Sequence, residues 1–267
     1  ADREFLASMM ETVEDIPREA ILSGLPWDWE HYGEYLNSIS EKPTSINIAG
    51  LVGHSAIRYY VMGDRSFEEQ ASAEEKQQMA DIVAKSLEGG AFGFSTNRFE
   101  PHKAPDGRSI PGTFAEPDEL AVISKAVAQR NGLMQSVGAS PDVMEAIANE
   151  GSRLLFSYGT QAEPGAGAKS AQWLEQFSAG RDVTAVTHVR SSGLLLSLST
   201  KFAIRGEAWK QLNDANVAQS LRLIDDADFV AQLVAEAEAS EAKICVGELI
   251  YRGADGVHNY TAKRSVT

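Results

Sequence analysis

The sequence has little of what several protein classes need. It contains one cysteine, Cys245, so it cannot form an internal disulfide, and we expect a cytoplasmic location. No apolar run approaches the ~20 residues of a membrane-spanning helix. Basic residues number 24 against 38 acidic ones, which gives a formal net charge of -14. An acidic surface repels phosphate, so the composition argues against nucleic-acid and membrane partners.

Several motifs that would specify a chemistry are also missing. The chain has no H-x-H, no H-E-x-x-H and no paired C-x-x-C that could hold a metal. It has no G-x-S-x-G serine elbow, and no G-x-G-x-x-G follows a predicted strand. The residues alone therefore leave the catalytic groups and the metal ligands unknown.

What is present is an alternation of short β-branched runs with helical patterns. We predict strands over 46–52, 91–95, 133–137, 153–158 and 182–189, with helices between them. No hairpin signal joins neighbouring strands, and parallel strands need crossover helices, so the predicted fold class is α/β with a parallel sheet. From the pattern alone, both a doubly wound sheet and a (β/α)8 barrel remain open.

The chain length suits one large domain, and 43% hydrophobic residues suffice for a sizeable core. A complete (β/α)8 barrel typically needs ~250 residues for eight units. Here about five βα repeats fill residues 46–190, and residues 194–241 are helical and charged, as expected of an insertion or an outer helical layer. Both termini are typical of positions inside a longer protein, so we expect residues 1–267 to form an incomplete barrel domain.

Polar side chains follow the predicted strands where a parallel barrel would gather its functional groups. His54 and His188 stand at strand ends, where a histidine ligates a metal, acts as a base, or simply hydrogen-bonds at the rim of the core. The candidate substrate-binding residues at these ends are His54, Arg58, Ser95, Arg98, His102, Tyr158, His188 and Arg190.

The segment 97–115 is long, polar and rich in Pro and Gly, and it leaves the end of a predicted strand. Connections of this length are usually functional loops or disordered ones. Arg98, His102, Lys103 and Arg108 make it locally basic, so a small molecule with a carboxylate is the expected partner. A solvated charged loop is the alternative interpretation.

Three phrases together resemble one family. They are EDIPREAILSGLPWDWE (14–30), INIAGLVGHSAIRYYVMGDR (46–65) and GGAFGFSTNRFEPHKAPDGRSIPGTFA (89–115). They are similar to the N-acyl-D-amino-acid deacylases, the D-aminoacylase-like branch of the amidohydrolase superfamily. The similarity is strong over the first half of the chain and only general from 132 to 260.

The resemblance implies a TIM-type barrel beside a small β-sandwich, and hydrolysis of a non-peptide C–N bond by metal-activated water, usually with zinc. It also implies an H-x-H and a cysteine ligand upstream of the residues present here, and a catalytic Asp beyond Thr267. The family has two histidine ligands at the ends of consecutive middle strands. The corresponding places here read Gln135-Ser136-Val137 and Ser157-Tyr158-Gly159.

Two functions from different classes follow. The first is a metal-dependent amidohydrolase in which His54 and Arg58 line the substrate mouth and the 97–115 loop covers it; the fragment itself would be inactive. The second is a degenerate barrel that acts as a non-catalytic binding or regulatory protein, which the absent histidines favour. An unrelated barrel enzyme that uses His54 and His188 directly is a third interpretation.

Overall fold

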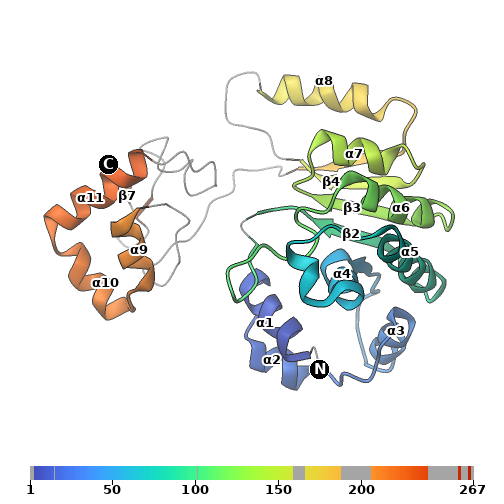
Figure 1. Ribbon diagram of the computed structural model, residues 1–267, viewed down its shortest axis with the longest axis horizontal. Helices are drawn as coiled ribbons and strands as arrows, with labels where there is room; N and C mark the ends of the chain where they lie inside the picture. The colour runs from blue at the N-terminus through green and yellow to red at the C-terminus, as the bar shows by residue number, and fades with distance from the viewer. Residues whose placement is uncertain are drawn as a thin grey trace. The chain divides into compact units, whose positions relative to one another are not determined.

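The computed structural model describes residues 3–14, 16–100, 102–158, 166–187 and 206–239, with short strands at 258–259 and 264–265. The chain divides into two compact units, Ala1–Val189 and Arg190–Thr267. Figure 1 shows both units. Over the described residues, every helix is too short or too polar to span a lipid bilayer.

The first unit contains a five-stranded sheet in which all strands are parallel and follow one another in chain order. Its strands are β1 (Leu51–Gly53), β2 (Gly93–Asn97), β3 (Leu133–Val137), β4 (Arg153–Ser157) and β5 (Val183–Val186). The α/β fold class and the parallel sheet are therefore confirmed. An unbroken 1-2-3-4-5 order is the arrangement found along the wall of a (β/α)8 barrel, since a doubly wound sheet reverses its strand order.

The strand predicted over 46–52 is shorter in the structure. Only its end forms β1, because Ile46 and Ile48 are 72% and 47% exposed and lie outside the sheet. Strands β2, β3 and β4 lie within two residues of their predicted positions. Strand β5 ends at Val186, and positions 188–189 of the predicted strand lie outside the described residues.

Helices connect the strands and cover one face of the sheet. They are α4 (His54–Met62), a 3-10 turn at Gly63–Phe67, α5 (Ala73–Glu88), α6 (Pro117–Ala128), α7 (Pro141–Ala148) and α8 (Ala166–Ser178). Figure 1 shows α5 to α8 in chain order beside β2, β3 and β4. Local sequence sets their starts: Ser72 and Glu75 form a capping box at α5, and Pro117 and Pro141 occupy first-turn positions of α6 and α7.

The core lies between the helices and the sheet. Phe94, Met134, Leu154 and Phe156 point from β2, β3 and β4 toward the helices and are at most 3% exposed. Because side chains alternate along a strand, their neighbours Ser95, Gln135 and Leu155 lie on the opposite face and are more exposed. In a closed barrel this second face is the interior one.

Three helices precede the sheet: α1 (Arg3–Glu14), α2 (Arg18–Gly24) and α3 (Tyr32–Ser40). Helix α1 contacts α2 and joins the rest of the unit through Phe5, whose ring stacks on Tyr59 of α4 at 4.6 Å between centroids. The second unit contains α9 (Glu207–Asp214), α10 (Val217–Ile224), α11 (Ala227–Glu238), β6 (His258–Asn259) and β7 (Arg264–Ser265). Its helices fall within the region 194–241 for which helices were predicted; that this region is an insertion stays a prediction.

Candidate functional site

The carboxyl ends of the five strands meet at one edge of the sheet, and this edge is the candidate site. Strand pairing aligns Gly53 with Ser95, Ser95 with Gln135, and Gln135 with Leu155. His54 directly follows β1 and Tyr158 directly follows β4. His54 and Tyr158 therefore stand at the same edge of the sheet, while Ser95 and Gln135 lie two residues before the ends of β2 and β3.

A polar pair lies on the open face of the sheet just below this rim. The Ser95 hydroxyl donates to the side-chain oxygen of Gln135. Their strands, β2 and β3, are neighbours in the sheet. That bond fixes the orientation of the Gln135 amide and directs its nitrogen, which carries two N–H donors, away from Ser95. Within the described part of the chain, no side-chain partner is recorded for that nitrogen.

The basic loop residues are mostly engaged by the protein itself. Arg98 donates from Nη1 to the carbonyls of Gly112 (3.3 Å) and Ala115 (2.7 Å), and burial lowers the pKa of its guanidinium. His102 Nδ1 lies 2.7 Å from the amide of Asn97. Arg108 pairs with Asp64 and Asp106, so its charge is neutralised locally. Arg98, His102 and Arg108 are thus held by contacts within the protein, while Lys103 and Asp106 are exposed. That the loop binds a carboxylate stays a prediction.

His54 is buried beneath this loop, with 2% of its surface exposed. Its Nε2 lies 2.7 Å from Glu119 Oε1, and its Nδ1 lies 3.0 Å from Thr96 Oγ1. Burial lowers the pKa of the imidazole, while the nearby Glu119 carboxylate opposes this shift. A neutral ring satisfies both contacts: Nε2–H donates to Glu119, and Nδ1 accepts the Thr96 hydroxyl proton.

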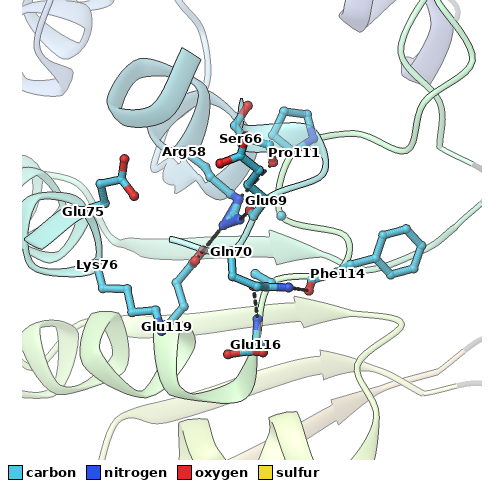
Figure 2. A network of polar contacts seen from close by, with 12 residues as sticks. Arg58, Ser66, Glu69, Gln70, Glu75, Lys76, Pro111, Phe114, Glu116 and Glu119 are labelled. Atoms are coloured by element: carbon cyan, nitrogen blue, oxygen red, sulfur yellow. Dashed lines mark hydrogen bonds and ion pairs between the residues drawn. The ribbon is translucent and has the colours of Figure 1, made fainter. Parts of the chain in front are cut away.

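Arg58 completes a buried network around the same carboxylate, which Figure 2 shows from close by. Its Nη1 donates to both oxygens of Glu119, at 2.6 and 2.9 Å, and its Nε donates to the Ser66 carbonyl at 3.1 Å. Glu119 is fully buried in the first turn of α6. The network therefore ties α4 to α6 through an ion pair out of contact with water.

The loop closes tightly over His54. The added Cβ of an alanine at Gly112 would lie 2.6 Å from His54 Nδ1, and the φ of Gly112 is +92°. Nearby, Ser55 donates to the Pro111 carbonyl, and the Gln70 side chain bonds the backbone of Phe114 and Glu116 (Figure 2). His54 and Arg58 thus have their polar groups committed to Glu119 and its neighbours; their role at a substrate mouth stays a prediction.

Tyr158 lies at the far side of the rim and borders a hollow of about 310 Å³ between the ends of β3 and β4 and helices α7 and α8. Its ring stacks on Trp173 at 5.4 Å between centroids. His188 and Arg190, the other two candidate residues, lie outside the described residues.

Two features of the site were missed from sequence. Glu119 gives no local signal beyond being an acidic residue in the first turn of a helix, and its partners lie 61 and 65 residues away. Ser136 was noted only as part of the phrase Gln135-Ser136-Val137 at a strand end, yet its hydroxyl is buried without a hydrogen-bond partner among the described residues.

The residues at the rim do not fit a zinc ion. Over the described residues, no three His, Cys, Asp or Glu side chains lie close enough together to hold a metal. The open face at β3 and β4 presents Gln135, Leu155 and Ser157 instead, and none of these is a usual zinc ligand.

Comparison with known proteins agrees with the expected relationship. An uncharacterised protein of Mycobacterium tuberculosis is 32% identical over 166 residues, which are 58% of this chain and 26% of that protein. The N-acyl-D-glutamate deacylase of Alcaligenes xylosoxydans is 33% identical over 117 residues, which are 43% of this chain and 22% of the enzyme. About half of the chain is distantly homologous to N-acyl-D-amino-acid deacylases.

The chain spans about a quarter of the length of the curated relatives it matches. No family model matches the chain. Among solved structures, the N-acyl-D-glutamate deacylase of Bordetella bronchiseptica, complexed with zinc and a phosphonate inhibitor, is similar with a TM-score of 0.48 and 24% identity. That match covers 58% of this chain and 33% of the enzyme.

Proposed function

We propose that the protein hydrolyses a C–N bond other than a peptide bond, in an N-acyl-amino acid or a related amide. The observation that carries this proposal is the polar rim of the parallel sheet, in a chain half of which is homologous to deacylases. In parallel barrels, substrates bind at this end of the strands. Such a substrate would be a small molecule with a carboxylate.

The open-face pair would bind the scissile amide. Gln135 is held by Ser95, so its amide nitrogen can donate to the substrate carbonyl oxygen without first having to be ordered. A donor fixed in advance at that oxygen stabilises the negative charge that develops when water attacks the carbonyl carbon. The C–N bond then breaks, the acyl group leaves as a carboxylic acid, and the amine takes up the proton from water.

Arg98 is the candidate for binding the substrate carboxylate. It stands at the end of β2 beside Gln135's strand, and both of its recorded side-chain bonds use Nη1. Its second terminal nitrogen can therefore pair with an anion, since guanidinium groups bind carboxylates with two parallel donors. His102, held at Asn97, would lie beside that anion, and the other candidate residues would shape the surroundings.

The family resemblance implies that the full gene product uses zinc. The described residues do not form a zinc site, so no step is assigned to the metal here. A cytoplasmic location likewise stays a prediction. The alternative, a barrel that binds without catalysis, is not favoured by homology to enzymes.

The test is an assay of hydrolysis with a panel of N-acetyl-amino acids of both D and L configuration. The measured quantity is the free amine released. It should be run on the 267-residue chain and on the full product of its gene, with and without a chelator. We expect turnover by the full gene product and loss of turnover with chelator. Chelator-insensitive turnover would exclude zinc but keep the hydrolase, whereas ligand binding with no turnover on any substrate would select the non-catalytic alternative.

A further inference from the structure

The hollow beside Tyr158 has features of a second small-molecule site. It lies between the carboxyl ends of β3 and β4, the start of α7, and α8, and its volume of about 310 Å³ falls at the lower end of the range for ligand pockets. Ser136 and Phe156 reach it from the helix-facing side of the sheet, and Ser157 borders it from the strand end. Neither Ser95 nor Gln135, the pair proposed to bind the scissile amide, lines the hollow.

The Ser136 hydroxyl is a buried polar group of the hollow. Ser136 is 1% exposed, and among the described residues its hydroxyl has no hydrogen-bond partner. Leaving a buried hydroxyl unpaired typically destabilises a protein by about 1–3 kcal/mol, so such groups are rare without a reason. Because Ser136 lines the hollow, a ligand atom placed there would satisfy it.

The rest of the wall selects for flat, uncharged groups. Tyr158 and Trp173 stack with 25° between their planes, and Phe156 meets both edge-on, at 5.4 and 6.1 Å between centroids. Tyr158 is also anchored by its hydroxyl, which donates to the Ser170 carbonyl. Met144 adds an adaptable apolar side chain, and none of the lining residues is charged. Aromatic walls favour planar partners, and an uncompensated ligand charge would be unfavourable against them.

We propose that this hollow binds a neutral, planar, mainly apolar group bearing one hydrogen-bonding atom, such as an aryl amide, with that atom on the Ser136 hydroxyl. The proposal does not depend on the proposed hydrolase function, because neither Ser95 nor Gln135 lines the hollow.

Ligand-observed NMR and calorimetric titration of the 267-residue chain with benzamide test the proposal. Benzoate serves as the charged counterpart and cyclohexanecarboxamide as the non-planar one, and both should bind at least several-fold more weakly than benzamide. Ser136→Ala should weaken benzamide binding about 2- to 10-fold, the range for one net hydrogen bond. Ala139→Leu, which places extra bulk in the hollow, should abolish it.

Ser86→Ala is the matched control, since Ser86 is a buried serine in α5 away from the hollow. It should leave benzamide affinity unchanged, and far-UV circular dichroism should show that all three variants are folded. The proposal is overturned if benzamide does not bind, if benzoate binds as well as benzamide, or if Ser136→Ala and Ala139→Leu both retain wild-type affinity. Benzamide binding by the chain, together with no amine release from any N-acetyl-amino acid by the full gene product, would support this site while contradicting the proposed function.

Discussion

The buried ion pair between Arg58 and Glu119 allows a sharp prediction about stability. Replacing Glu119 with Gln keeps the shape of the side chain but removes its charge. The Arg58 side chain, 3% exposed, would then remain as a buried cation without its counterion. Breaking a buried pair in this way typically destabilises a protein by about 3–5 kcal/mol, a large share of the 5–15 kcal/mol that holds a domain folded.

The neighbouring residue provides the control. Asp118 pairs with Lys76 at 2.6 Å, but the Asp118 side chain is 63% exposed. Exposed pairs contribute roughly 0–1 kcal/mol, so Asp118→Asn should have little effect. Urea unfolding followed by circular dichroism measures both variants. The double variant Arg58→Met, Glu119→Leu should recover most of the lost stability, because apolar replacement of a buried pair is often neutral or favourable.

Equal midpoints for Glu119→Gln and Asp118→Asn would refute this reasoning. They would mean that the Arg58–Glu119 pair is not shielded from water in the folded protein.

Three further predictions concern the same region. Gly112→Ala should destabilise the chain more than Gly107→Ala in urea unfolding. Both glycines have positive φ, but only at Gly112 would a Cβ meet His54. Equal losses of stability would contradict the packing described. Because burial lowers the folded pKa of His54 below its unfolded value of about 6.5, the unfolded state binds more protons as the pH falls below that value. As the pH falls, this residue should lower the free energy of unfolding by up to about 1.4 kcal/mol per pH unit. His54→Gln should remove that part of the dependence of stability on pH between pH 7.5 and 5.5. The same dependence in wild type and variant would show that the pKa of His54 is not lowered. Ser72→Ala should reduce stability by about 0.5–2 kcal/mol through loss of the helix cap, and rescue by Ser72→Asp would confirm that the cap is the cause.

Much of the fold could be predicted because it is encoded locally. The spacing of Ser72 and Glu75 predicts the start of a helix, and Pro117 predicts another because proline is favoured in the first turn. The absence of hairpin turns between β-branched runs was enough to predict a parallel sheet. These signals need no knowledge of which distant segments meet.

The candidate site could be predicted only in outline. Rim residues were found because parallel strands end at one edge, but the partners of His54 could not be found. Glu119 reaches it across 65 residues of sequence, and only the fold brings the start of α6 close to the start of α4. Several roles were left open for a histidine at a strand end, and the structure shows His54 hydrogen-bonded to Thr96 and Glu119 with the loop closing over its ring through Gly112.

The most direct test of the account is kcat/KM for amine release from the best N-acyl-amino acid, compared between wild type, Gln135→Leu and Gln176→Met in the full gene product. Gln176 is an exposed glutamine of α8 and serves as the control. Loss of one oxyanion donor typically lowers kcat by ~10²–10³-fold, so we predict a loss of this size for Gln135→Leu and little change for Gln176→Met. Wild-type kcat/KM in a folded Gln135→Leu variant would contradict the assignment of the site to this rim.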